Sequence, residues 1–326
     1  MEQTNKFNIY SHVTDKIIAD LEKGVRPWQK PWNSAHTSGR IVRPRRHNGL
    51  PYNGVNILLL WSEAYDKGYQ SPTWMTFRQA QEYGGHIRKG EKSCTVVYAS
   101  TFSKTEQDET TGKDIEKDIP FLKGYRVFNA EQIEGLPERF TVQPETSELS
   151  KPERLDLVDQ FIRNTGADLR HGGDKAFYAE TPDYIRVPRI EAFKEPESYY
   201  GTLTHELTHW TKHKSRLERT FVTDCNAPRS FGDESYAKEE LVAEIGSAFL
   251  CADLGITPEV REDHASYIGH WLKALKDDRK LIFSAAAHAG RASEYLKDLQ
   301  SKVTCVPTPP SAAAPTLLPA TTLAQQ

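Results

Sequence analysis

The sequence predicts an α+β protein of two domains: a mixed helix and β-hairpin domain, followed by a largely helical domain with a small antiparallel sheet. Its 326 residues are enough for two ordinary domains. Residues 1–104 carry 15 lysines and arginines against 8 acidic residues, a net charge of +7, whereas the remainder carries −10. A basic first third joined to an acidic remainder indicates that the first part binds a polyanion and that the remainder has a different function.

The first helix is predicted over residues 9–21, where apolar residues recur at helical spacing until Gly24 ends the element. Residues 25–54 should be irregular, because their prolines interrupt any periodic structure. Helices are then expected over 55–68 and 72–85, and paired strands over 94–102 and 122–129.

The second domain is predicted to begin after a linker, because residues 136–152 show no apolar periodicity. A helix over 153–166 and a hairpin over 176–188, with its turn near 181–183, come first. Further helices are expected over 201–212, 235–255 (where Gly255 can cap the end), 262–277 and 279–301. The predicted organisation is a domain over 1–135, the linker, a domain over 153–303, and a disordered Pro/Ala/Thr tail over 304–326.

Membrane and secreted classes are not indicated. No stretch approaches the roughly 20 apolar residues that a transmembrane helix needs, and the N-terminal segment lacks the apolar core of a signal peptide. The four cysteines lie far apart and form no CxxC pair, which argues against a disulfide framework or a zinc knuckle. We therefore expect a cytoplasmic protein without membrane contact.

Residues 205–209 read HELTH, which places two histidines four residues apart on one predicted helix. Positions i and i+4 share a helix face, so His205 and His209 can direct both imidazoles at one metal ion. Glu206 can then act as general base toward water at that ion. The alternative is an exposed histidine-rich helix face, but the uncharged residues around the motif argue against it.

A third ligand is predicted on the acidic helix downstream. Glu240 and Glu244 share a face there beside an apolar stripe, where carboxylates are costly unless they are paired or bind metal. The E-x-x-x-E pattern resembles the ExxxD arrangement of gluzincins, and this resemblance implies Glu240 as the ligand and Glu244 as the residue that holds a ligand histidine through its other ring nitrogen, with the reverse as the alternative; Glu239 is expected to be solvated. Tyr236 is a candidate for stabilising an oxyanion, or else a packed tyrosine. Two nitrogens and one oxygen suit Zn²⁺ best, with Mn²⁺ or another divalent ion as the alternative.

The N-terminal third interleaves aromatic and basic residues, as proteins that hold single strands do. Such proteins combine a positive groove for phosphates with aromatic faces on which bases of any sequence stack. The candidate contacts are Arg26, Trp28, Lys30, Trp32, Arg43, Arg45, Arg46, Tyr52, Trp74, Arg78, Arg88 and Lys89. In the alternative, the aromatic residues fill a small core and the arginines form a solvated face. The sequence contains no helix-turn-helix, zinc-finger or RRM motif, which argues against sequence-specific recognition of duplex DNA.

With these residues in view, the chain resembles the ArdC-type antirestriction proteins of conjugative plasmids, and its first domain also resembles the N-terminal part of TraC-type plasmid primases. The first domain carries the likeness in PWQKPW, PYNGVNILLLW, GYQSPTWMTFRQAQEYGGHIRKGE and YRVFNAEQIEGLP. The second carries it in YIRVPRIEAF, YYGTLTHELTHWT, HKSRLER, YAKEELVAEIGSAFLCADLG and YIGHWLKALKDD. Several long motifs in the right order make this far more specific than HExxH alone.

The resemblance implies an N-terminal domain that binds single-stranded DNA without sequence preference and a C-terminal zincin-like metallopeptidase domain of the gluzincin type. His205, Glu206 and His209 match the family's HExxH motif, and Glu240 and Glu244 match its EELVAE stretch. The implied role is to protect incoming plasmid DNA from host restriction in the recipient of a conjugation, with a restriction–modification enzyme or another host protein as the candidate target. The alternative is a cytosolic zinc metalloprotease whose basic N-terminal domain recruits protein substrates.

Overall fold

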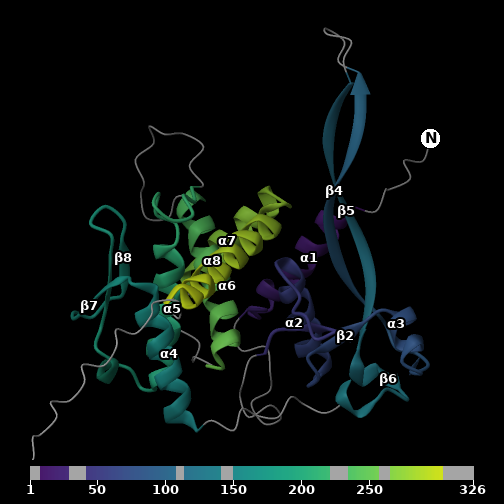
Figure 1. Ribbon diagram of the computed structural model, residues 1–326, viewed down its shortest axis with the longest axis horizontal. Coiled ribbons are helices and arrows are strands. Elements are labelled where there is room, and N and C mark those ends of the chain that lie inside the picture. Colours follow the sequence, from purple (N-terminus) through teal and green to yellow (C-terminus); the bar gives the residue numbers. More distant parts are fainter. Residues whose placement is uncertain are drawn as a thin grey trace, which may run out of the picture.

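In the computed structural model of the protein, residues 8–28, 42–107, 114–140, 150–220, 234–256 and 265–303 are described. They form an N-terminal part around a long two-stranded ribbon and a largely helical C-terminal part with a small sheet (Figure 1). The predicted α+β class is confirmed.

The N-terminal helices begin and end at the residues that favour such ends. Helix α1 (Ile9–Glu22) starts behind Asn8, whose side chain accepts a hydrogen bond from the main-chain N–H of Tyr10 at 2.9 Å. Helix α2 (Val55–Lys67) ends at Gly68, which has a left-handed φ of 72°.

The predicted helix over 72–85 is partly wrong. Residues Thr73–Met75 form a strand, β2, because the main chain of Trp74 and Met75 pairs with that of Asn129 and Phe128 in the ribbon. Helix α3 (Phe77–Glu82) begins only after Thr76, which forms a capping box with Gln79.

The ribbon is antiparallel and projects from the body of the molecule (Figure 1). It consists of β4 (Cys94–Gln107) and β5 (Asp114–Asn129), so both strands are longer than predicted. With β1 (Arg45–Arg46) and β2 they form a sheet in the order β1-β2-β5-β4. A smaller pair joins β3 (His86–Ile87) to β6 (Ile133–Glu134).

The C-terminal part opens with α4 (Lys151–Thr165) and a three-stranded sheet in the order β7-β9-β8. The predicted hairpin is confirmed as β8 (Phe177–Ala179) and β9 (Tyr184–Val187). Strand β7 (Asp168–His171), which the sequence did not predict, pairs with β9 in parallel, so the sheet is mixed rather than antiparallel.

Four helices complete the C-terminal part. They are α5 (Pro196–Trp210), α6 (Glu234–Leu254), α7 (Ala265–Asp277) and α8 (Leu281–Val303). Helix α6 is central, since it packs against α5, α7 and α8. None of the described helices is long and apolar enough to cross a membrane.

One hydrophobic core contains residues of both parts, from α1 and α2 as well as from α6, α7 and α8. The rings of Trp28 and Trp271 meet edge-on at 5.8 Å, and those of Trp61 and Phe249 at 5.9 Å. A second core lies among α4, α5 and β9. The domain boundaries stay a prediction; residues 141–149 of the predicted linker and the tail over 304–326 lie outside the described residues.

Candidate metal centre

Helix α5 positions the HELTH residues in a buried environment. Every side chain from Tyr199 to Trp210 is buried. His205 and His209 lie one turn apart on the same face, with ring centroids 4.8 Å apart and planes at 80°. They are only 7% and 8% exposed, which excludes the alternative of a solvated histidine-rich face.

Helix α6 brings the carboxylate of Glu240 to both imidazoles. Its Oε2 lies 3.4 Å from His205 Nε2, and its Oε1 lies 3.3 Å from His209 Nε2. One ligand atom from each residue can be chosen so that all three lie within 4.8 Å of one another. Two imidazole nitrogens and one carboxylate oxygen that converge in this way fit a divalent cation such as Zn²⁺.

Each histidine also contacts a further carboxylate through its second ring nitrogen. His205 Nδ1 lies 3.5 Å from Glu244 Oε1, and His209 Nδ1 lies 3.0 Å from Glu239 Oε1. Carboxylates in this position fix the ring orientation and decide which nitrogen faces a metal. The expectation that Glu239 is solvated is wrong, because Glu239 is buried against His209.

Arg219, which the sequence pattern did not single out, holds Glu239 from the other side. Its guanidinium donates to Glu239 Oε2 at 2.9 Å and to Oε1 at 2.8 Å. It also donates to Thr211 Oγ1 and to the carbonyl of Thr208. Nothing in HKSRLER separates this arginine from its basic neighbours, because its role depends on the position of α6.

Burial and charge act in opposite directions on the ionisable groups of the cluster. Burial lowers the pKa of His209, but the charges of Glu240 and Glu239 and their hydrogen bonds outweigh it and raise the pKa to about 10. Burial raises the pKa of Glu239, but Arg219 and His209 outweigh it and lower the pKa to about 2. In the same way His209 and His205 hold the pKa of Glu240 well below its ordinary value, against the effect of burial. Glu239 and Glu240 are therefore ionised, as a cation site requires, whereas a metal ion would have to displace a proton from His209, because a ligand imidazole is neutral.

The two predicted catalytic side chains flank these ligands on different helices. Glu206 is buried next to His205, and among the described residues its carboxylate has no hydrogen-bond or ion-pair partner. Tyr236 is half-buried one turn before Glu240, and its hydroxyl lies 3.5 Å from that of Tyr267. Burial and the charge of Glu240 raise the pKa of Tyr236, so its hydroxyl keeps its proton.

Four predicted DNA contacts are enclosed by other side chains instead. Trp28 and Trp74 are each 1% exposed, and Tyr52 is also buried. Arg43 is buried as well, with its Nε 2.7 Å from Asp253 Oδ1. Bases cannot stack on enclosed rings, so the structure favours the alternative that these residues belong to the core.

The remaining predicted contacts are distributed over the surface. The exposed ones are Arg45, Arg46, Arg78, Arg88 and Lys89. Arg78 and Arg88 each form an ion pair with a nearby glutamate. Arg26 is half-buried, and Lys30 and Trp32 lie outside the described residues.

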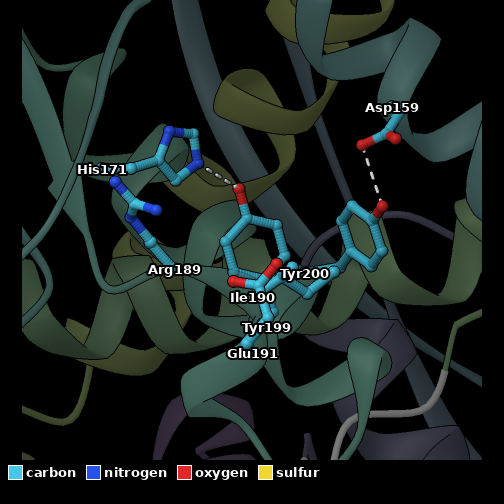
Figure 2. A pocket seen from close by; sticks show the side chains of 7 residues that line it. All are labelled: Asp159, His171, Arg189, Ile190, Glu191, Tyr199 and Tyr200. Atoms are coloured by element: carbon cyan, nitrogen blue, oxygen red, sulfur yellow. Dashed lines mark hydrogen bonds between the residues drawn. The ribbon is translucent and has the colours of Figure 1, made fainter.

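A separate pocket of about 520 Å³ lies at the start of α5, and no metal-centre residue lines it (Figure 2). Its walls are Asp159, His171, Arg189, Ile190, Glu191, Tyr199 and Tyr200. His171 Nε2 lies 2.9 Å from the Tyr199 hydroxyl, and the Tyr200 hydroxyl donates to Asp159 at 2.8 Å. These bonds attach the first turn of α5 to β7 and α4.

Two known families match separate segments of the chain. The profile described as the N-terminal domain of anti-restriction factor ArdC matches residues 7–128, and that of a zincin-like metallopeptidase matches residues 156–288. The chain is 36% identical over 299 residues to the uncharacterized protein y4eC of Sinorhizobium fredii (strain NBRC 101917 / NGR234), covering 90% of this chain and 93% of that protein. It is 35% identical over 307 residues to the DNA primase TraC of Escherichia coli, but spans only 27% of that primase.

Two solved structures are similar to this chain over most of its length. The metal-free crystal structure of the antirestriction protein ArdC from plasmid R388 is 45% identical, with a TM-score of 0.74, and the match covers 91% of this chain and 99% of that one. The Mn(II)-bound structure of the same protein is 44% identical, with a TM-score of 0.70, and covers 90% and 98%. The zincin-like domain thus implies a divalent metal.

Proposed function

Because this chain belongs to the ArdC family of anti-restriction factors, we propose that it binds single-stranded DNA without sequence preference and protects incoming plasmid DNA from host restriction. It would act in the cytoplasm of the bacterium that receives DNA by conjugation, with a restriction–modification enzyme or another host protein as target. Its C-terminal part would be a metal-dependent peptidase. The convergence of His205, His209 and Glu240 is the observation that supports the peptidase.

The metal-binding residues would be His205, His209 and Glu240, with Glu244 behind His205. This donor set favours Zn²⁺, and Mn²⁺ is the alternative. A cation bound there supplies positive charge that polarises a peptide carbonyl and acidifies water. Glu206, a buried carboxylate next to His205, would take the proton from the attacking water and pass it to the leaving amine. The protonated hydroxyl of Tyr236 would donate a hydrogen bond to the developing oxyanion.

The small sheet offers a place for an extended peptide. Within the described sheet β8 pairs only with β9, which leaves its other edge open. Helix α5, which carries the histidines, packs against β8. An extended chain can add to such an edge through main-chain hydrogen bonds, so we propose this edge as the substrate-binding strand.

Two variants test the peptidase half. Glu206→Gln should keep its metal by elemental analysis but lose peptide hydrolysis, because an amide cannot accept the proton. His205→Ala/His209→Ala should lose the metal as well. Metal-free wild-type protein, or full hydrolysis by Glu206→Gln, would contradict the assignment.

Gel shifts with unlabelled competitors test the DNA half. Single strands should bind more tightly than duplex, and binding should weaken as salt is added, because phosphate contacts release counterions. A restriction-protection assay with Glu206→Gln then shows whether hydrolysis is needed. Peptide hydrolysis without any affinity for DNA would replace this proposal by the protein-recruiting metalloprotease.

A further inference from the structure

Three exposed aromatic side chains gather on the ribbon. Tyr98 of β4 is 51% exposed, and Phe121 and Tyr125 of β5 are 37% and 39% exposed. The ring of Tyr98 lies 6.2 Å, centroid to centroid, from each of the other two. Large aromatic rings left in water next to one another indicate a binding surface.

The register places the three rings on the same face. Directly opposite residues of antiparallel strands point to the same side of the sheet. The pairs on this face are Val96 with Tyr125, Tyr98 with Lys123, and Ser100 with Phe121. At the end of the ribbon nearest the body, Val96 and Val127 on this face are buried in the core. From Tyr98 outward, none of the described side chains of this face is buried.

The opposite face and one edge of the ribbon are held by helices. A Cβ at Gly124 would lie 3.0 Å from Ile9 Cδ1, so α1 packs directly against the ribbon backbone. The Asn56 side chain of α2 donates to the carbonyl of Val97 at 2.8 Å and accepts from its N–H at 2.7 Å. These contacts fix the ribbon while they leave the aromatic face uncovered.

The half of the ribbon nearest the body carries only positive charge. Residues 94–102 and their partners 119–127 contain Lys123 on the aromatic face and Arg126 on the opposite face, but no acidic residue. Among the described residues neither Lys123 nor Arg126 has an ion-pair partner. Lys123 Nζ lies 5.3 Å from the ring centre of Tyr125. Cations that are not neutralised by the protein are available to an anionic ligand.

We propose that the aromatic face formed by Tyr98, Phe121 and Tyr125 is a surface on which single-stranded DNA stacks its bases, with Lys123 beside the phosphates. This inference rests on the proposed function and specifies where on the protein the single-stranded DNA binds. Stacked rings accept any base, so the surface needs no sequence preference. Aromatic residues are also enriched at protein–protein interfaces, but lysine is depleted there, so Lys123 beside the rings favours an anionic strand over a protein partner.

The test uses the full-length chain and a labelled oligothymidine in fluorescence anisotropy. Stacking on one ring contributes on the order of five- to a hundredfold in affinity. Tyr98→Ala/Phe121→Ala/Tyr125→Ala should therefore raise Kd at least about tenfold. Tyr65→Ala, which removes an exposed ring of α2, should leave Kd unchanged. Tyr98→Phe/Tyr125→Phe should bind like wild type, because the rings remain. Lys123→Ala should lower the slope of log Kd against log salt by about 1.

The outcomes separate the two proposals. If wild-type protein binds no single-stranded DNA, the proposed function fails. If wild type binds and the triple alanine variant, with an unchanged melting temperature, binds as tightly, only the ribbon assignment fails. Loss of self-association in that variant without loss of DNA binding would assign the face to a second copy of the chain and overturn the proposal.

Discussion

At the scale of single residues, both histidines of the candidate metal centre use both of their ring nitrogens. Each directs Nε2 at Glu240, while the Nδ1 atoms contact Glu244 and Glu239. A carboxylate behind the ring sets the tautomer and the orientation of the nitrogen that faces the ion. The imidazoles are therefore oriented before any cation arrives.

Removing Arg219 should weaken metal binding. Arg219→Ala leaves Glu239 buried without its main counter-charge, and breaking a buried pair in this way costs about 3–5 kcal/mol. Arg219 holds Glu239, the carboxylate behind His209, and a displaced carboxylate in that place lowers metal affinity by about 10- to 100-fold. Urea unfolding and competition against a fluorescent chelator measure the two effects.

A second variant separates positioning from stability. Arg219→Ala/Glu239→Gln buries no unpaired charge, so it should recover most of the unfolding free energy but not the metal affinity. Arg78→Ala, which breaks only an exposed pair with Glu82, should change neither property by more than about 1 kcal/mol. Wild-type metal affinity in Arg219→Ala would contradict the positioning role.

His288 of α8 should make stability depend on pH. Burial, with the positive charges of Arg291 and Arg219, lowers the pKa of His288 to about 4 from an ordinary value of 6.5. Between pH 6.5 and pH 4, His288 binds a proton in the unfolded chain but not in the folded chain. The unfolding free energy should therefore fall as pH drops from 6.5 toward 4.

The measurement compares wild type with His288→Gln by urea unfolding from pH 7 to pH 4.5. Carboxylates titrate in both proteins, so their difference isolates the histidine. Wild type should lose stability relative to the variant as the pH falls. A difference that stays constant over this range would show that His288 is not responsible.

At the scale of elements, the candidate site is closed by a tight contact between α5 and α6. A Cβ at Gly246 of α6 would lie 2.6 Å from Thr208 Cγ2 of α5. One turn away the hydroxyls of Thr204 and Ser247 lie 2.8 Å apart, and Ser247 donates to the carbonyl of Gly201. Small residues along this line let α6 approach closely enough for its carboxylates to reach the histidines.

Gly246→Ala should therefore damage both the fold and the site. Thr208 cannot move away easily, because it is β-branched and its hydroxyl donates to the carbonyl of Thr204 at 2.8 Å. Overpacking of this kind costs about 1–3 kcal/mol. The helices should separate and metal affinity should fall, as chemical denaturation and chelator competition would record.

Gly269→Ala is the matched control. It lies on α7 with nothing within 4 Å of the new Cβ, so it should stabilise by about 0.5–1 kcal/mol through helix propensity. If Gly246→Ala behaved in the same way, the close contact would not limit the approach of α6.

The elements that could be predicted from the sequence are those whose signals are local. Gly68 and Gly255 end α2 and α6, and the HELTH spacing places two imidazoles on one face. Strand β7 was missed because its exposed residues have no alternating pattern and its partner is β9. The carboxylates that face each histidine depend on how α5 crosses α6, which is why Glu239 was misjudged. Trp28 lies in irregular chain and Trp74 in the three-residue strand β2, and neither segment is long enough for a periodicity that tells a core ring from an exposed one.

At the scale of the whole molecule, α6 connects the two parts. One face carries the carboxylates of the metal centre, and other residues of the helix belong to the core shared with α1 and α2. Arg43 strengthens this connection, since it pairs with Asp253 of α6, donates to Ser293 of α8 at 2.9 Å and lies 4.9 Å from the Phe249 ring centre. The chain segment between the parts is therefore not their main link.

A shared core predicts that both parts unfold together. Buried tryptophans report on each of them, Trp61 and Trp74 on the N-terminal part and Trp271 on α7. Urea unfolding followed by tryptophan fluorescence and by metal release should give one midpoint. Arg43→Ala should shift both signals by the same amount, about 1–3 kcal/mol, because it removes a buried ion pair and leaves Asp253 with its exposed partner Lys297.

Two separate midpoints would mean that the parts are independent units that only touch. A shift of one signal alone in Arg43→Ala would locate the effect of Arg43 in a single part. Coincident shifts carry a functional consequence, because a ligand that stabilises the N-terminal part must then also stabilise α6 and the carboxylates it presents. Single-stranded DNA should in that case raise the urea concentration at which the metal is released.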